Sequence, residues 1–278
     1  MSSFVDLHIH SNLSDGLHTP TDVLADVRRR ELTAFAVTDH DTLAGYRAVR
    51  DLTNDSDPEL VPGVELSVSG GEYDLHLLAY YLDPDYTPLL KILEDFCNHR
   101  NQRAGVIVER LNGLGVEITL DDVIRVAQAA AVGRPHIATA MHASGAVSSY
   151  QMAFDKYLGN GKPAYVPKKN FDPELAISLV HEAGGVVVLA HPAIEETFQH
   201  LEMLVGLGLD GIEVYHPSHK PKQVDQFKHL AERFRLIITG GSDSHGRAGR
   251  YGEIGSLSVS EDLMPALRQR ARQRKERA

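Results

Sequence analysis

Short apolar runs recur along the chain, and most of them are separated by segments with a helical pattern. Two helices have clear start signals, because Pro20–Arg30 follows Thr19 and Pro173–Ala183 follows Asp172. Strands that alternate with helices predict a mainly parallel sheet. About seven such units without a dinucleotide-binding fingerprint favour a barrel over an open sheet. The expected strands are Phe4–Ile9, Ala34–Thr38, Leu60–Val64, Leu75–Tyr81, Val186–Ala190, Gly211–Tyr215 and Leu236–Thr239.

The middle of the chain interrupts this alternation. Residues 99–169 have a helical pattern with few strand signals, so we expect an inserted small helical subdomain, with residues 1–98 and 170–278 forming an α/β barrel domain. The insertion has nine Lys and Arg against five Asp and Glu, a net charge of +4, which leaves −14 for the remainder of a chain whose total is −10. A basic insertion over an acidic barrel suits an anionic substrate, although helical surfaces also differ in charge for no functional reason.

Composition narrows the class of protein. The net charge of −10 argues against binding to long duplex DNA, and the basic C-terminal segment RQRARQRKERA predicts a frayed, solvated helix rather than a nucleic-acid contact. No apolar run reaches the roughly 18 residues of a membrane span. The start MSSFVDLHIH lacks the features of a secretion signal, and the single Cys97 cannot form an internal disulfide. We therefore expect a cytoplasmic protein that does not contact membranes.

Histidines and acidic residues gather where the predicted strands end. In D-L-H-I-H-S, His8 and His10 point to the same side of a strand, and later strands end in T-D-H-D, G-V-E, A-H-P and S-D-S-H. Each residue alone has an ordinary explanation as a hydrogen-bonded core histidine or a turn residue. If these residues were unrelated to one another, they would not be expected to recur at the same end of successive strands. The predicted metal ligands are His8, His10, Asp15, His40, Glu65, His76, His191, Asp243 and His245.

Nine ligands are too many for one ion, because a metal in a protein takes about four to six ligands. We expect two or three divalent ions, with Glu65 as a bridging carboxylate. Imidazole and carboxylate without thiolate suit Mn²⁺, which we expect, or Zn²⁺ or Fe²⁺, and disfavour an all-oxygen Mg²⁺ site. Clustered ions of this kind serve phosphoryl transfer. The expected reaction is attack on a phosphoester by a metal-bound hydroxide, without a covalent enzyme intermediate.

Taken together, these motifs resemble the polymerase and histidinol phosphatase (PHP) superfamily over residues 4–98 and 170–255. The resemblance implies a distorted (β/α)7 barrel with a trinuclear metal site. It also implies how the ligands are shared among three ions. The three sets are His8, His10, Glu65 and Asp243; then Glu65, His76 and His191; then Asp15, His40 and His245.

Two motifs in the insertion resemble those of one branch of this superfamily. G-R-P-H-I-A at 133–138 and Y-L-G-N-G-K-P-A-Y-V at 157–166 resemble the branch that contains 3′,5′-nucleoside bisphosphate phosphatases and 5′-to-3′ exoribonucleases. This branch implies removal of the 3′-phosphate from nucleotides such as 3′-phosphoadenosine 5′-phosphate, which gives AMP. It also implies stepwise release of nucleotides from short 5′-phosphorylated RNA. Both reactions cleave a phosphoester on a 3′-oxygen beside a 5′-phosphate, so one site can perform both.

Arg134 is the first candidate for a substrate contact, because a guanidinium can bind phosphate through two parallel hydrogen bonds. His136 stands close to it in the sequence, and Lys162 and Lys168 are weaker candidates. His219, in Y-H-P-S-H-K, is expected to contact the phosphate or the leaving group, with an ordinary surface position as the alternative. The expected catalytic residues are His191, Asp243, His245 and His219.

Two alternative functions stay open. The first is an L-histidinol phosphate phosphatase of the same superfamily, whose substrate carries no second phosphate. The basic insertion argues against it. The second is a non-catalytic PHP module of the kind found in polymerases, which the complete set of nine ligands argues against.

Overall fold

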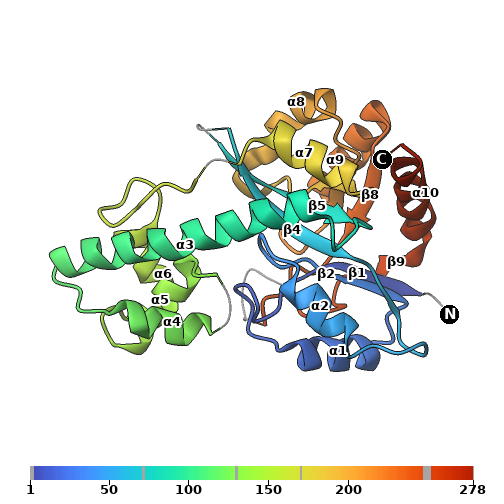
Figure 1. Cartoon of the computed structure of the whole chain (residues 1–278). Coiled ribbons are helices and arrows are strands. Elements are labelled where there is room, and N and C mark those ends of the chain that lie inside the picture. Colours follow the sequence, from blue (N-terminus) through green and yellow to red (C-terminus); the bar gives the residue numbers. More distant parts are fainter. Residues whose placement is uncertain (1–2, 71–72, 129–130, 170, 247–251, 278) are drawn as a thin grey trace.

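The computed structural model describes residues 3–70, 73–128, 131–169, 171–246 and 252–277. Its strands form two sheets, ordered β3-β2-β1-β9 and β4-β5-β6-β7-β8 (Figure 1). Parallel bridges join Ile9 to Ser244 and His40 to Glu65, so the two sheets close into a distorted barrel. The strands are β1 (Phe4–Ile9), β2 (Ala34–Val37), β3 (Glu59–Leu60), β4 (Gly63–Ser69), β5 (Asp74–Tyr80), β6 (Val186–Leu189), β7 (Gly211–Tyr215), β8 (Ile237–Gly240) and β9 (Val259–Ser260).

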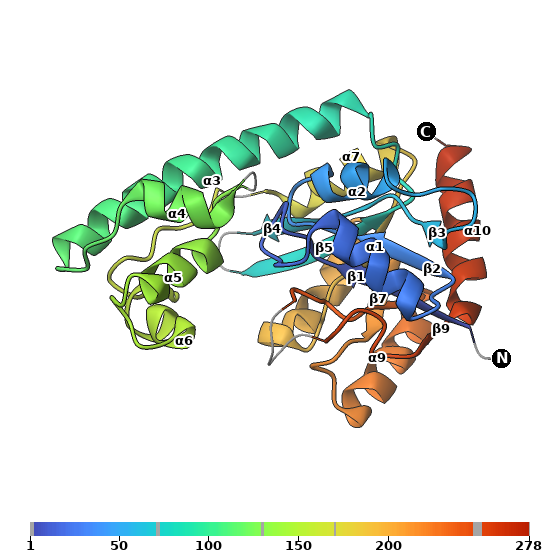
Figure 2. The ribbon, with the colours of Figure 1, turned by 90° about the horizontal axis from the view of Figure 1, so that it is seen from below.

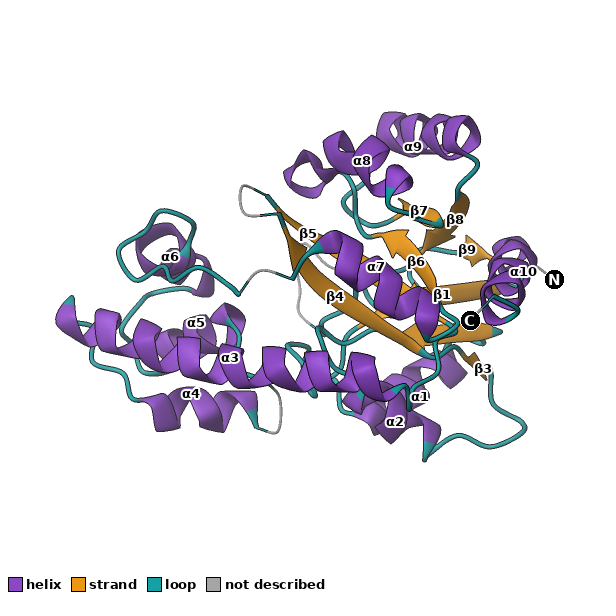
Figure 3. Ribbon diagram, turned by 45° about the horizontal axis from the view of Figure 1, so that its top comes forward, coloured by secondary structure: helices purple, strands orange, loops and turns teal. Residues whose placement is uncertain are grey.

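Helices lie on the outside of the barrel and also form a separate group beside it (Figure 3). The helices around the barrel are α1 (Pro20–Arg29), α2 (Ala44–Arg50), α7 (Pro173–Glu182), η2 (Ile194–His200), α8 (Leu201–Gly206), α9 (Pro221–Phe234), η3 (Glu261–Leu263) and α10 (Met264–Lys275). The separate group consists of the outer part of α3 (Thr87–Gly113) with α4 (Leu120–Ala127), α5 (Arg134–Ala143), α6 (Tyr150–Ala153) and η1 (Phe154–Leu158).

The predicted helix starts are confirmed. The Thr19 side chain accepts a hydrogen bond from the Asp22 backbone N–H, and the Asp22 carboxylate accepts one in return from the Thr19 N–H. Asp172 likewise accepts from the first free N–H groups of α7. Gly184, which follows this helix, has φ +72°, a left-handed conformation that favours glycine.

The prediction of a mainly parallel sheet is wrong for the second sheet. Strand β5 runs antiparallel to both β4 and β6, whereas the other pairs among β4–β8 are parallel. Only residues 70–73 connect β4 to β5, and a parallel pair would need a crossover of about a dozen residues or more. The strand expected at Leu60–Val64 is also two strands, because the chain leaves β2 at Pro62 and joins β5.

Helix α10 covers the amino ends of the parallel strands. Leu267 packs with Val186 in the barrel interior. Arg270 and Arg274 donate hydrogen bonds to the fully buried Asp210 carboxylate, at 2.9 and 2.7 Å. The prediction of a frayed, solvated C-terminal helix is therefore wrong, because its apolar side fills the core and two of its arginines neutralise a buried charge.

The helices of the insertion have a core of their own. Phe96, on the first half of α3, packs in the core on the barrel side, whereas Ile107 and Leu111 pack with Met141 of α5 in a second core. The long helix α3 thus begins on the barrel and ends in the helical group (Figure 2). It runs across the boundary expected between residues 98 and 99 and fixes the helical group beside one end of the strands.

Candidate metal centre

Strand geometry brings the predicted ligands to one end of the barrel. His8 lies near the end of β1, and His10 follows that strand directly. His191 and Asp243 lie in the turns shortly after β6 and β8. Parallel strands place such residues at one edge. Glu65 departs from this expectation, because it lies inside β4, which continues to Ser69. A parallel β-bridge pairs Glu65 with His40 and so places it beside the other predicted ligands.

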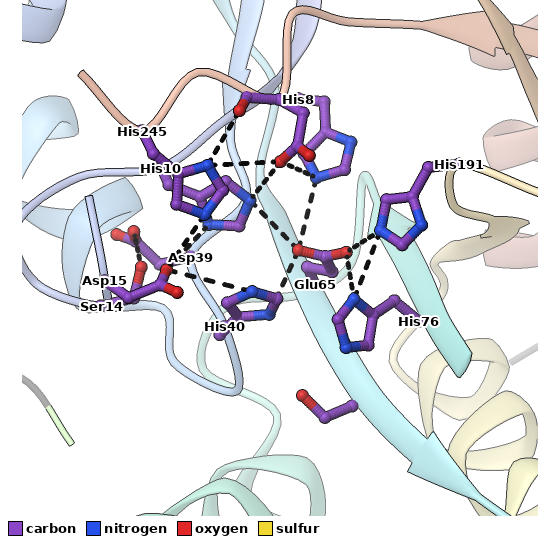
Figure 4. Close-up of polar contacts among 12 residues, drawn as sticks. His8, His10, Ser14, Asp15, Asp39, His40, Glu65, His76, His191 and His245 are labelled. Carbon is purple, nitrogen blue, oxygen red and sulfur yellow. Dashed lines mark hydrogen bonds and ion pairs between the residues drawn. The ribbon is translucent and has the colours of Figure 1, made fainter. Parts of the chain in front are cut away.

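Glu65 lies at the centre of the histidine cluster and is buried (Figure 4). Five ring nitrogens surround its carboxylate. The distances to Oε2 are 3.3 Å from His8 Nε2, 3.1 Å from His10 Nε2 and 3.2 Å from His40 Nδ1, and those to Oε1 are 2.9 Å from His76 Nδ1 and 3.0 Å from His191 Nε2. Each oxygen faces a different group of imidazoles, so this carboxylate has the geometry needed to bridge two ions.

Two further carboxylates flank Glu65. Asp243 Oδ1 is 3.4 Å from His8 Nε2 and 3.2 Å from His10 Nε2. Asp15 Oδ1 is 3.3 Å from His245 Nε2 and 3.9 Å from His40 Nε2. The His, Asp and Glu side chains of the site form three groups that could each hold an ion. Within each group, the possible ligand atoms lie within 4.8 Å of one another. The groups are His10, Asp15, His40 and His245; His8, His10 and Asp243; and His40, Glu65 and His76.

The buried polar atoms of this cluster fit divalent cations. His8 Nε2, both ring nitrogens of His10, His40 Nδ1 and Glu65 Oε2 have no hydrogen-bond partner among the described residues. A buried polar atom without a hydrogen bond costs about 1–3 kcal/mol, so several at one point indicate a group that binds them together. Imidazoles and carboxylates are the ligands of first-row divalent metals.

The pKa values of the ring nitrogens differ sharply across the cluster. Burial lowers the pKa of His40 to about 3. For His10, burial also favours the neutral ring, but the carboxylates of Asp243 and Glu65, at 3.2 and 3.1 Å from Nε2, raise the pKa to about 10. Burial would raise the pKa of Glu65, yet the imidazoles of His40 and His76 hold it well below its usual range. The carboxylates therefore carry enough negative charge to hold a proton on His10, and a divalent cation at the same position would take the place of that proton.

Three residues around the ligands were not predicted as functional. Glu213 of β7 is buried, and its carboxylate lies 3.0 Å from His8 Nδ1. His216, which directly follows β7, is also buried and lies 3.2 Å from Asp243 Oδ2. Asp39 accepts hydrogen bonds from the Ser11 N–H and hydroxyl at 2.7 and 2.6 Å, and from the neighbouring Ser14 hydroxyl. The signal for Glu213 is visible in G-I-E-V-Y, where one acidic residue interrupts an apolar strand.

A cavity of about 1160 Å³ opens over the metal centre and extends to the helical subdomain. Most of the predicted ligands form one wall, and basic side chains of the helical group line the other: Arg100, Arg103, Arg134, Lys168 and Lys169. Burial, together with the charges of Arg134 and Arg100, lowers the pKa of Arg103 to about 10. Burial also lowers the pKa of Lys168, although Asp74 opposes this effect at 3.4 Å. The crowded cations favour an anion in this part of the cavity.

The predicted substrate contacts divide into two groups. Arg134 and Lys168 line the cavity, whereas the cavity walls in the described part of the chain include neither His136, Lys162 nor His219. His136 Nδ1 accepts the Gly133 N–H at 3.0 Å at the start of α5, and Lys162 is exposed on the outer surface.

His219 is buried beside the metal centre rather than exposed to the cavity. Its Nδ1 is 2.9 Å from the Val214 carbonyl, and its ring packs 4.9 Å from that of Phe227. A phosphate contact would require this side chain to reorient. His99 and His142 also line the cavity.

Comparison with known proteins identifies the family. The PHP domain matches residues 6–276, which is nearly the whole chain. The chain belongs to the PHP domain family. The fold is also that of a PHP protein, because the chain superposes with a TM-score of 0.88 on a candidate metal-dependent phosphoesterase from Bifidobacterium adolescentis. That structure is 30% identical in sequence, and the match covers 97% of each chain.

Three curated relatives have named activities. The chain is 33% identical over 272 residues to a 3′,5′-nucleoside bisphosphate phosphatase of Chromobacterium violaceum, covering 95% of this chain and 94% of the relative. It is 33% identical over 250 residues to the 5′-3′ exoribonuclease Rnm of Escherichia coli, covering 86% and 84%. It is 31% identical over 254 residues to a phosphoribosyl 1,2-cyclic phosphate 1,2-diphosphodiesterase of Eggerthella lenta, covering 90% and 97%.

These findings confirm the predicted superfamily, the barrel fold and the class of reaction. All three relatives are named for the hydrolysis of phosphoester bonds, and this chain is a PHP phosphoesterase that uses divalent metal ions. Within the described residues, no helix is long and apolar enough to cross a membrane.

Proposed function

We propose that this enzyme removes the 3′-phosphate from 3′,5′-bisphosphonucleotides, such as 3′-phosphoadenosine 5′-phosphate, and releases nucleotides from the 5′ end of short RNA. One observation carries the proposal: a single cavity has a metal centre on one wall and Arg100, Arg103, Arg134 and Lys168 on the other. A substrate with two phosphates has one group for each wall. A relative of each named activity supports the two substrates.

The metal centre would hold up to three ions, with Mn²⁺ the expected metal because the donors are imidazole and carboxylate. His8, His10, Glu65 and Asp243 would hold the first ion, Glu65, His76 and His191 the second, and Asp15, His40 and His245 the third. The three groups of nearby ligand atoms support this division, although the third of those groups contains His40 in place of His191. The 3.0 Å contact between His191 and Glu65 supports the second set.

Bound divalent ions would lower the pKa of a water molecule and offset the negative charge of the phosphoryl group. The protein's part is to orient and to bind. Asp243, His245 and His191 would hold the ions at the scissile phosphate. His219, buried behind them, would contact the leaving group only after its side chain reoriented.

The basic wall would bind the phosphate that is not cleaved. Arg134 is held in place, because its Nη1 donates to the Leu158 carbonyl at 3.1 Å and to Asn160 Oδ1 at 3.2 Å, and its guanidinium lies over the Tyr165 ring. Lys168 would add a second positive charge. Residues 99–169 would thus cap the substrate over the barrel.

The test compares initial rates on five substrates with the Mn²⁺-loaded enzyme. They are adenosine 3′,5′-bisphosphate, adenosine 3′-monophosphate, 5′-phosphorylated RNA, histidinol phosphate and a 1,2-cyclic ribose phosphate. The bisphosphate should have a higher kcat/KM than the 3′-monophosphate, because only the former engages the basic wall. Faster turnover of histidinol phosphate, or of the cyclic diester, would reject the nucleotide assignment.

A further inference from the structure

Glu213 contacts two of the proposed metal ligands, His8 and His191. It lies in β7 with a fully buried side chain. Its Oε1 is 3.0 Å from His8 Nδ1, and its Oε2 accepts the backbone N–H of His191 at 2.8 Å. One carboxylate therefore contacts the side chain of one proposed ligand, in β1, and the main chain of another, in the turn after β6.

The contact with His8 decides which ring nitrogen carries the proton. An ionised carboxylate can only accept hydrogen bonds, so His8 Nδ1 must carry the hydrogen. In the neutral ring, the lone pair is then on Nε2, which faces Glu65 and Asp243 at 3.3 and 3.4 Å. That is the nitrogen on the side of the metal centre. An imidazole fixed in this way by a carboxylate is a better metal ligand than a free one.

The contact with His191 stabilises an unusual backbone conformation. His191 has φ +27°, in the left-handed region that residues other than glycine rarely adopt because it is strained. The hydrogen bond from its N–H to Glu213 holds the turn after β6 in this form. The turn directs the imidazole toward Glu65, where Nε2 is 3.0 Å from Oε1.

We propose that Glu213 is a positioning residue, which fixes the tautomer of His8 and the turn of His191 so that both present lone pairs to the metal ions. This inference rests on the metal centre of the proposed function, but not on the identity of the substrate. It accounts for an acidic side chain in the interior of an otherwise apolar strand.

Glutamine at this position cannot replace the carboxylate. Both contacts require an acceptor, whereas an amide offers one oxygen and one NH₂ group. If the Glu213→Gln oxygen accepts the His191 N–H, the NH₂ group faces His8 Nδ1 and favours the tautomer with the proton on Nε2. If the amide is turned over, two donors meet at His191 instead. Either arrangement impairs one ligand while the volume of the side chain is kept.

The experiment measures metal affinity in the absence of substrate. Wild type, Glu213→Gln and Asp210→Asn are stripped with a chelator and titrated with Mn²⁺ against an indicator chelator, after circular dichroism has shown that each is folded. Asp210 is a matched control, because it is also fully buried and immediately precedes β7 at the opposite end of the barrel. We expect Glu213→Gln to bind Mn²⁺ about 10–100-fold more weakly, and Asp210→Asn to keep the wild-type affinity.

A second variant and a spectroscopic measurement test the role of Glu213 independently. If Glu213→Gln does not fold, Glu213→Asp takes its place, since it keeps the charge but is too short to reach both partners. It should also lose affinity. Nitrogen-15 spectra of metal-free protein, recorded at a pH where the His8 ring is neutral, should show its proton on Nδ1 in wild type and a changed tautomer in Glu213→Gln.

Wild-type affinity in the folded Glu213 variant would overturn the positioning role alone. A wild-type protein that binds no divalent metal would overturn the proposed metal centre and this inference with it. An altered Mn²⁺ affinity in Asp210→Asn equal to that of the Glu213 variant would also reject the inference, because the effect would then be a general loss of stability.

Discussion

Truncation of Arg134 to alanine should weaken substrate binding while the metal ions stay bound. The side chain lines the cavity on the subdomain wall, opposite the ligands. One of its terminal nitrogens, Nη1, is engaged by Leu158 and Asn160, which leaves the others to bind a phosphate. We therefore count one or two hydrogen bonds to a charged group, each worth about 1.5–3 kcal/mol.

A single bond of that strength corresponds to a loss of affinity of roughly 10- to 150-fold, at about 1.4 kcal/mol for each factor of ten. The assay is KM for adenosine 3′,5′-bisphosphate, with metal content measured by elemental analysis on the same samples. Lys162→Ala is the matched control, because Lys162 is a basic residue of the same subdomain that is exposed and lies outside the cavity walls. An unchanged KM in Arg134→Ala, or a parallel loss of metal, would refute the phosphate-binding role.

Three other predictions concern the ligands and the scaffold. Asp243→Asn should abolish hydrolysis and lower metal content, and near-normal rates would reject its role as a ligand. Gly45→Ala should destabilise the fold, seen as a lower melting temperature, because its Cβ would lie 1.8 Å from the Asp39 carboxylate. Burial would raise the pKa of the Asp210 carboxyl, but its hydrogen bonds lower the pKa to about 2. The ionised form therefore adds about 2 kcal/mol to the free energy of unfolding above pH 4. The urea midpoints of wild type and Asp210→Asn should therefore converge as the pH falls from about 4 to 2.

The clustering of the predicted ligands could be anticipated because their pattern is local. A histidine or an acidic residue directly after a buried strand can be read from a few neighbouring residues, as in A-H-P with His191. Parallel strands then bring such residues to one edge. The helix starts at Thr19 and Asp172 were predictable for the same reason, since a cap involves residues only two or three positions apart.

Features that depend on distant pairs were not predictable in this way. The antiparallel course of β5 follows from its pairing with β4 and β6, and the role of Arg274 follows from Asp210, which lies 64 positions away in the sequence. His136 is close to Arg134 in the sequence, yet it is not among the described residues that line the cavity. Its ring instead meets the Gly133 N–H within the same turn.

One ion pair joins the basic wall to a residue next to a proposed metal ligand. Arg100, on α3, forms an ion pair with Asp41 and donates to the Ser67 hydroxyl at 3.0 Å. Asp41 immediately follows His40 in the sequence, and its other oxygen accepts the Ser67 N–H at 2.7 Å. The helix that carries the subdomain is therefore joined to the turn that carries a proposed ligand. A pair of walls can select for the distance between two phosphates only if their separation is constant. If the enzyme distinguishes bisphosphates from monophosphates as proposed, this link would help to hold that separation.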